Sequence, residues 1–312
     1  LKTAVKLAIR RIERRVSRRM AKLSQTGNNE DRSEADMPAT APIPPRPDLI
    51  PGYTIRALIG ESEKPIVYLG AREAVGREVA LKVATAEDIS SEQHLLEREY
   101  AAISTIRHPA IVELYDSGVH GGREYLAMEY FPRGDLKARL QQGLTEAEAL
   151  RYVEHIASAL RIVHHAGILH RDLKPPNVML RENDDIALID FGLARNLEGG
   201  LQSTRTGVLR GSPYYMSPEQ ALGEELDART DLYGLGVIFY EMLTGRKPFS
   251  GSSAIEVLQE HVNTPVPRLP EGLAHHQALL SRLLAKARDE RFASAEEVIE
   301  AVAAAQLARE PQ

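Results

Sequence analysis

Two patterns of secondary structure follow each other along the chain, and their order constrains the fold more than any other feature of the sequence. Between residues 53 and 129 the chain holds short runs rich in β-branched and aromatic residues, with one helical run at about 90–106. The runs that we expect to form strands are 53–59, 66–71, 77–84, 111–117 and 123–129.

After residue 135 the pattern becomes mostly helical. Two short apolar runs, 178–181 and 186–189, interrupt it and predict two further strands. Because a strand-rich part precedes a helix-rich part, the sequence predicts an α+β protein with two lobes. The expected helices cover 145–166, 229–244, 253–262, 273–285 and 294–308.

The segment before these patterns is strongly basic. Residues 1–23 hold nine Lys and Arg and one acidic residue, a net charge of +8, whereas the whole chain carries −5. Their apolar residues recur at steps of three and four, which predicts a basic amphipathic helix. We expect it to pack on a second copy of the chain, as a homodimer, or on an upstream signalling domain such as a receiver domain. A membrane surface or a nucleic acid is the alternative partner.

A linker and several exclusions complete the organisation. Residues 24–52 contain six prolines among polar residues and predict a flexible linker. The chain has no cysteine, which excludes disulfides and thiolate metal sites. No run reaches the ~18 apolar residues of a membrane span, and no secretory signal is visible, so we expect a cytoplasmic protein without a membrane span. The negative net charge argues against nucleic-acid binding by the chain as a whole.

A lysine and a glutamate in the strand-rich part are expected to pair. Ala80 and Lys82 share one face of their strand, because side chains alternate along a strand. Glu99 falls inside the apolar stripe of the following helix, where an unpaired carboxylate is costly. Lys82 is the natural partner, and a surface pair with Arg98 or Arg107 is the alternative.

Residues 170–177, with the sequence HRDLKPPN, form the most informative motif. Its two prolines predict a loop, the kind of segment on which catalytic side chains are commonly held. Asp172 could accept a proton from an attacking hydroxyl group, and Lys174 could hold the phosphoryl group that moves. Asn177 offers a neutral oxygen to a metal ion.

A second motif, Asp190-Phe191-Gly192, follows the apolar strand 186–189. A carboxylate at the end of a strand suits a hard cation, although turn chemistry alone explains such a short motif. Two strands separate Asn177 from Asp190 and would fold these residues side by side. The combination of the two motifs at this short range is very unlikely to arise by chance.

These motifs resemble those of the eukaryotic-type serine/threonine protein kinase family, in the form common in bacteria, over residues 53–308. The resemblance implies a two-lobed protein kinase fold, with a small β-rich N-lobe and a larger helical C-lobe. It also implies ATP with Mg²⁺ or Mn²⁺ as cofactors and proteins as substrates. Lys174 is the residue typical of serine/threonine rather than tyrosine kinases.

The resemblance also assigns roles to single residues. The implied catalytic residues are Lys82 with its partner Glu99, Asp172 as base, and Lys174, and the implied metal ligands are Asn177 and Asp190. Glu219 is expected to pair with Arg291, and Asp231 is expected to brace the catalytic loop. Met128 corresponds to the gatekeeper, followed by a hinge of two residues. The implied ATP contacts are Gly60, Ser62, Val67, Ala80, Lys82, Met128, Glu129, Tyr130, Asp135 and Met179.

One motif departs from the family pattern G-x-G-x-x-G-x-V. Only Gly60 and Val67 of that pattern remain at residues 60–67. Ser62 and Pro65 restrict the close approach of the backbone to phosphates that glycines allow, and Pro65 lacks an N–H group. We therefore expect a weaker affinity for ATP and a lower rate, with the fold unaffected.

Three functions fit the sequence, and the active protein kinase fits best. The altered glycine loop supports the first alternative, an ATP-binding pseudokinase that acts as a signalling scaffold. A small-molecule phosphotransferase is the second alternative, and the long segment 193–219 argues against it. For regulation, we expect Arg171 to bind a phosphate that autophosphorylation places on Thr204 or Thr206. These threonines could also be ordinary polar loop residues.

Overall fold

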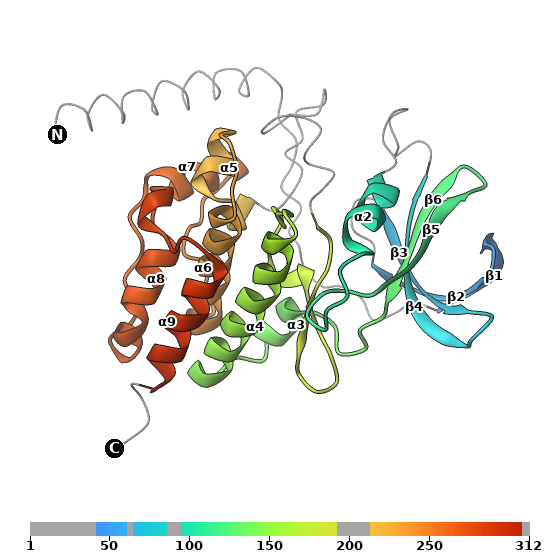
Figure 1. The fold of residues 1–312 in the computed structure, drawn as a ribbon, viewed down its shortest axis with the longest axis horizontal. Coiled ribbons are helices and arrows are strands. Elements are labelled where there is room, and N and C mark those ends of the chain that lie inside the picture. Colours follow the sequence, from blue (N-terminus) through green and yellow to red (C-terminus); the bar gives the residue numbers. More distant parts are fainter. Residues whose placement is uncertain (1–41, 61–64, 86–94, 192–212, 308–312) are drawn as a thin grey trace.

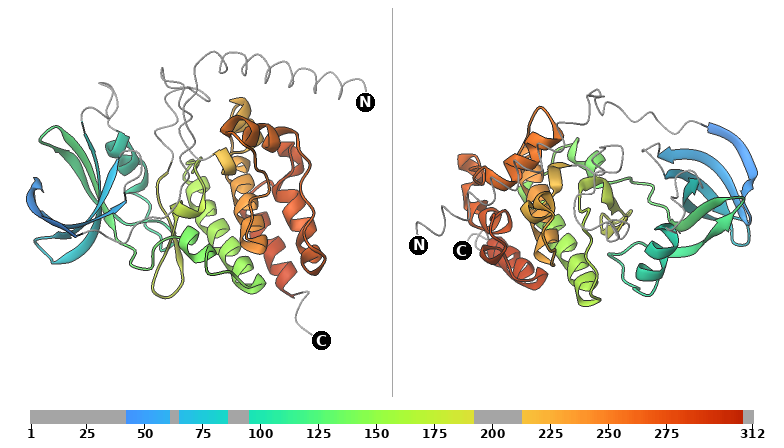
Figure 2. Two further views of the ribbon diagram at one scale, coloured as in Figure 1. Left: turned by 180° about the vertical axis from the view of Figure 1, so that it is seen from behind. Right: turned by 90° about the horizontal axis from the view of Figure 1, so that it is seen from above.

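The computed structural model describes residues 42–60, 65–85, 95–191 and 213–307, in two lobes at opposite ends of the molecule (Figures 1 and 2). The predicted helix 1–23, most of the predicted linker, Ser62, Thr204 and Thr206 lie outside these ranges. Within the described ranges, no helix combines the length and the apolar content needed to cross a bilayer.

The first lobe is an antiparallel sheet of six strands with one helix on it (Figure 1). The strand order is β1-β2-β3-β4-β6-β5, so that β4 lies inside the sheet between β3 and β6. The helix α2 packs on β5 and β6. The elements are β1 (Pro42–Ile50), β2 (Tyr53–Gly60), β3 (Ile66–Arg72), β4 (Arg77–Thr85), α2 (Leu95–Ile103), β5 (Leu114–His120) and β6 (Arg123–Glu129).

Two predictions about this lobe need correction. The end of the predicted linker 24–52 is the edge strand β1, which pairs with β2 and buries Ile50 completely. Prolines are tolerated at a sheet edge because no outer strand needs their N–H groups, and register shifts interrupt this pairing. The predicted strand 111–117 begins only at Leu114, because Ile111 instead forms an isolated bridge with Leu188 of the other lobe.

The second lobe is helical, with one small hairpin facing the sheet (Figure 1). The predicted helix 273–285 is a 3-10 turn followed by a shorter helix that ends at Leu283. The elements are α3 (Leu136–Leu140), α4 (Glu146–His165), η1 (Pro175–Asn177), β7 (Val178–Leu180), β8 (Ile186–Leu188), η3 (Pro213–Tyr215), α5 (Pro218–Leu222), α6 (Arg229–Thr244), α7 (Ala254–Asn263), η4 (Glu271–His276), α8 (Gln277–Leu283), η5 (Arg288–Glu290) and α9 (Ala295–Leu307).

The helices α4 and α6 form the centre of the second lobe. A capping box starts α4, with Thr145 and Glu148 each accepting a hydrogen bond from the other's backbone. The helix α6 buries most of its residues and passes close to α8 at Gly236. A Cβ atom at Gly236 would lie 2.8 Å from Cβ of Leu283, so a larger residue would push the two helices apart.

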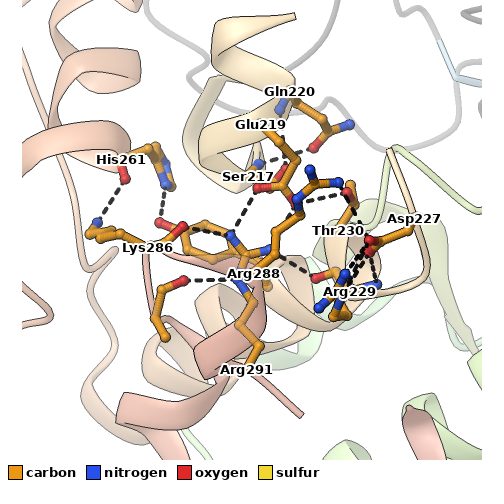
Figure 3. A network of polar contacts seen from close by, with 12 residues as sticks. Ser217, Glu219, Gln220, Asp227, Arg229, Thr230, His261, Lys286, Arg288 and Arg291 are labelled. Carbon is orange, nitrogen blue, oxygen red and sulfur yellow. Dashed lines mark hydrogen bonds and ion pairs between the residues drawn. The ribbon is translucent and has the colours of Figure 1, made fainter. Parts of the chain in front are cut away.

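A buried ion pair joins α5 to the segment before α9 (Figure 3). The Arg291 guanidinium donates to both carboxylate oxygens of Glu219, at 2.7 and 2.8 Å, and both side chains are almost fully buried. Thr230 donates to the same carboxylate at 2.8 Å, and Arg291 also donates to the carbonyl oxygen of Ala285 at 2.8 Å. The predicted contact between Glu219 and Arg291 is confirmed.

Removing the cation of this pair is expected to destabilise the protein strongly. Arg291→Met should lower the free energy of unfolding by about 3–5 kcal/mol, because it leaves a buried carboxylate without its cation. The matched control is Arg56→Met, which breaks a pair of similar length (2.8 Å) whose side chains are 50% exposed and which should cost at most ~1 kcal/mol. Urea unfolding of both variants measures this, and equal losses would contradict the account.

Candidate active site

The ammonium group of Lys82 lies where the two lobes meet. Lys82 Nζ is 3.0 Å from Glu99 Oε2 and 2.7 Å from Asp190 Oδ1. Lys82 comes from β4, Glu99 from α2, and Asp190 follows β8, so one cation links three elements. The predicted pairing of Lys82 with Glu99 is confirmed.

Burial and charge act against each other in this cluster. Burial opposes the charge of Lys82, but Asp190 and Glu99 hold the pKa of its ammonium group above the ordinary value. Burial would also raise the pKa of Asp190, but Lys82 outweighs it and holds this pKa below the ordinary value. Burial raises the pKa of Glu99, because the cation that opposes this effect is shared with Asp190. The cluster therefore keeps Lys82 charged and Asp190 ionised.

The predicted catalytic loop holds a second pair. Lys174 Nζ lies 3.1 Å from Asp172 Oδ2, and both side chains are about one-fifth exposed. Asn177 is buried and donates its amide N–H to the carbonyl oxygen of Asp172 at 2.8 Å. The loop thus presents a carboxylate and an ammonium group at the edge of the second lobe.

The hairpin of β7 and β8 brings the two predicted metal ligands together. The backbone N–H of Ile189 donates to the carbonyl oxygen of Asn177 at 3.0 Å, and Asp190 is the next residue. The amide nitrogen of Asn177 donates to Asp172, and its amide oxygen is the atom that could serve as a metal ligand. An ionised carboxylate and an amide oxygen are the ligands that Mg²⁺ prefers, so these residues fit that ion.

Two residues of the site have unusual backbone angles. Arg171 has a φ of 63° and Asp190 a φ of 56°, both in the left-handed region that residues other than glycine seldom adopt. Such a conformation costs about 1–3 kcal/mol and persists only where the surroundings hold it. Arg171 directly precedes Asp172, and Asp190 is itself a predicted metal ligand.

Asp231, at the start of α6, holds the strained loop. Its carboxylate accepts the backbone N–H of His170 at 2.9 Å and that of Arg171 at 2.8 Å. It also lies 2.8 Å from Nε2 of His164. Burial would raise the pKa of Asp231, but these donors outweigh it and hold the pKa below the ordinary value. The predicted bracing contact is confirmed.

Apolar side chains from both lobes meet in one cluster beside Lys82. Ala80 and Met128 are direct neighbours in the sheet, and Val67 and Met179 pack on the same cluster. Gly60 pairs with Val67 across β2 and β3. Four of the predicted ATP contacts, Val67, Ala80, Met128 and Met179, thus belong to one apolar cluster, and apolar side chains of this kind commonly line sites for flat rings.

The predicted hinge is tied to the second lobe. Arg181 donates to both carboxylate oxygens of Glu129, at 3.0 and 2.8 Å. Tyr130 follows directly and is partly buried. Asp135 forms a bridge with Met179, and its carboxylate caps α3 by accepting the N–H of Ala138 at 2.8 Å.

Comparison with known proteins identifies this arrangement. Residues 53–302 match the family model described as "Protein kinase domain". The chain belongs to the protein kinase family.

The relatives of this kinase domain include several bacterial proteins. A probable serine/threonine-protein kinase of Streptomyces coelicolor is 36% identical over 260 residues, which are 79% of this chain and 38% of the relative. The serine/threonine-protein kinase pkn2 of Myxococcus xanthus is 38% identical over 78% of this chain and 31% of its own length. The serine/threonine-protein kinase PknB of Mycolicibacterium smegmatis is 35% identical over 79% of this chain and 41% of its own length. The chain therefore spans less than half of these relatives.

Three residues that support the kinase site were not predicted. His164 contacts Asp231, Gln220 donates to the carbonyl oxygen of Arg171 at 2.7 Å, and Arg181 binds the hinge. The capping-box pattern that starts at Ser217 marks Gln220 as a helix-starting residue but gives no sign of its second contact. His164 and Arg181 carry no local signal, because their partners are distant in sequence.

The hydrogen bonds that Asp231 accepts from the loop predict a change in amide hydrogen exchange, which can be measured without an activity assay. In Asp231→Asn the backbone N–H groups of His170 and Arg171 lose charge-assisted hydrogen bonds, each worth about 1.5–3 kcal/mol. Amide hydrogen exchange at these two positions should therefore become at least ~10-fold faster. The control is Asp289→Asn, where the carboxylate is 92% exposed and exchange in the loop should not change. Unchanged protection in Asp231→Asn would contradict the brace.

Proposed function

We propose that this domain transfers the γ-phosphoryl group of ATP to serine or threonine hydroxyl groups of proteins. The observation that carries the proposal is the position of Lys82, whose ammonium group lies 3.0 Å from Glu99 and 2.7 Å from Asp190. A phosphate-binding cation, its orienting carboxylate and a metal-binding carboxylate are thereby within reach of one another. The named relatives, all serine/threonine-protein kinases, support the same class of substrate.

Asp172 acts on the hydroxyl group of the protein substrate. Its carboxylate accepts the hydroxyl proton while the oxygen forms a new bond to the γ-phosphorus and the bond to ADP breaks. Lys174, 3.1 Å from Asp172, stabilises the charge on the phosphoryl group during this step. Asn177 keeps the loop in place through its hydrogen bond to the carbonyl oxygen of Asp172.

Lys82 and Glu99 orient the nucleotide. Lys82 binds the phosphates, and Glu99 holds the ammonium group in position. When bound through Asn177 and Asp190, Mg²⁺ or Mn²⁺ neutralises the phosphate charge. The adenine ring of ATP packs on the apolar cluster of Val67, Ala80, Met128 and Met179. Its polar contacts are proposed at the hinge and at Asp135.

The remaining parts of the proposal concern regulation and partners. Thr204 and Thr206 are the proposed sites of autophosphorylation, and Arg171 is the proposed receptor for the phosphate. Ser62 and Pro65 are proposed to weaken ATP binding. The helix 1–23 is proposed to mediate dimer formation or to follow an upstream signalling domain. Because the reaction consumes ATP, we propose that the domain works in the cytoplasm.

A pair of lysine variants tests the proposed activity. Lys82→Met should lower the rate of phosphoryl transfer by at least ~100-fold, because it removes a preorganised charge at the phosphates. The control Lys137→Met removes an exposed lysine of α3 and should leave the rate unchanged. Transfer of labelled phosphate to a generic protein substrate, followed by phosphoamino-acid analysis, measures both rate and acceptor. Wild-type turnover in Lys82→Met would contradict the assignment.

A further variant, measured for both ATP binding and phosphoryl transfer, distinguishes the proposed kinase from a pseudokinase scaffold. Asp172→Asn should lose transfer while still binding ATP with Mg²⁺, because Asp172 acts on the acceptor and not on the nucleotide. A wild-type chain that binds ATP but transfers no phosphate to any acceptor would instead favour a pseudokinase scaffold.

A further inference from the structure

A glutamate and two consecutive histidines converge in the helical lobe. Glu146 Oε2 lies 2.9 Å from Nε2 of His275 and 3.0 Å from Nε2 of His276. Glu146 is the first residue of α4, and the histidines end the 3-10 turn η4, so the contact joins segments about 130 residues apart. The proposed kinase chemistry uses none of these three side chains.

The three side chains present the donor set of a transition-metal site. Two imidazole nitrogens and a carboxylate oxygen all lie within 4.8 Å of one another. In a tetrahedral zinc site with metal–ligand distances of about 2.0–2.2 Å, neighbouring ligand atoms are about 3.3 Å apart. The two glutamate–histidine separations of 2.9 and 3.0 Å would have to widen by a few tenths of an ångström around an ion, and the two imidazole nitrogens lie within 4.8 Å of each other.

Packing fixes one ligand and leaves the others accessible. The side chain of His276 is fully buried, and its ring stands edge-on to Phe239 with the centroids 5.7 Å apart. The ring centroids of His275 and His276 lie 4.1 Å apart. His275 is 44% exposed and Glu146 is 28% exposed, so an ion can enter from solvent and keep a water molecule as its fourth ligand.

The cluster is separate from the proposed catalytic metal site. Glu146 and His164 lie at opposite ends of α4, about 27 Å apart along the helix axis. His164 contacts Asp231, which holds the predicted catalytic loop. The ligand types differ as well. Asn177 and Asp190 offer oxygen atoms, which suit Mg²⁺, whereas two imidazoles favour zinc over magnesium.

We propose that Glu146, His275 and His276 form a second metal site that binds Zn²⁺ and clamps η4 to the start of α4. The carboxylate compensates part of the charge of the ion, and the histidines bind in their neutral form. The competing interpretation is a hydrogen-bonded cluster in which one carboxylate oxygen accepts from both imidazoles.

Calorimetric titration with Zn²⁺ alone tests the proposal. The full chain is used with the substitution Asp190→Asn, so that the proposed catalytic metal site does not contribute. We expect one Zn²⁺ per chain with a dissociation constant in the micromolar range or lower. In this background, Glu146→Gln and His275→Gln should each weaken binding at least ~10-fold, because each removes a ligand. Both positions are partly exposed, so these variants are expected to fold.

The matched control is His165→Gln, which removes another exposed histidine, 72% exposed and 3.5 Å from Glu296, and should leave Zn²⁺ binding unchanged. Co²⁺ gives a second readout, because a tetrahedral site with nitrogen ligands produces visible absorption that Glu146→Gln and His275→Gln should remove. No binding of Zn²⁺, or binding that both variants leave unchanged, would overturn the proposal and favour the hydrogen-bonded cluster. Wild-type kinase turnover in His275→Gln is expected, and the Zn²⁺ result does not depend on it.

Discussion

The ammonium group of Lys82 connects three parts of the chain that are distant in sequence. It lies within 3.0 Å of carboxylates from α2 and from the segment after β8, and thus ties the sheet, its helix and the second lobe to one point. Because the side chains of Lys82 and Glu99 are only 12% and 10% exposed, the two carboxylates depend on the cation that they share. The apolar cluster around Met128 then lies next to this point of charge, which suits a ligand with a flat ring and a phosphate chain.

The second lobe holds the backbone of the site in place. Arg171, next to Asp172, and Asp190, a predicted metal ligand, adopt left-handed backbone conformations, and such conformations last only when their surroundings hold them. For Arg171, Asp231 provides that support by accepting the backbone N–H groups of His170 and Arg171, and Gln220 donates to the carbonyl oxygen of Arg171. The helices α5 and α6 therefore support the site through contacts with its backbone.

Parts of the structure with a local physical cause were predictable from the sequence. Glu99 stands in an apolar stripe and needs a cation, so its pairing with Lys82 followed from the cost of an unpaired buried charge. The strand Pro42–Ile50 was not predictable, because its composition is that of a linker and its pairing depends on a neighbouring strand. His164 was missed for a similar reason, since its partner Asp231 is 67 residues away. The match to the protein kinase family confirms the fold, whereas the roles of single residues remain predictions.

In the proposed mechanism, Glu99 supports phosphoryl transfer only through Lys82. A double-mutant cycle of phosphoryl-transfer rates for Lys82→Met, Glu99→Gln and the double variant tests it directly. If Glu99 acts through Lys82, the double variant should be as slow as Lys82→Met alone, within the factor of about two that independent errors produce. A double variant whose loss equals the product of the two single losses would show that the residues act independently and would contradict the account.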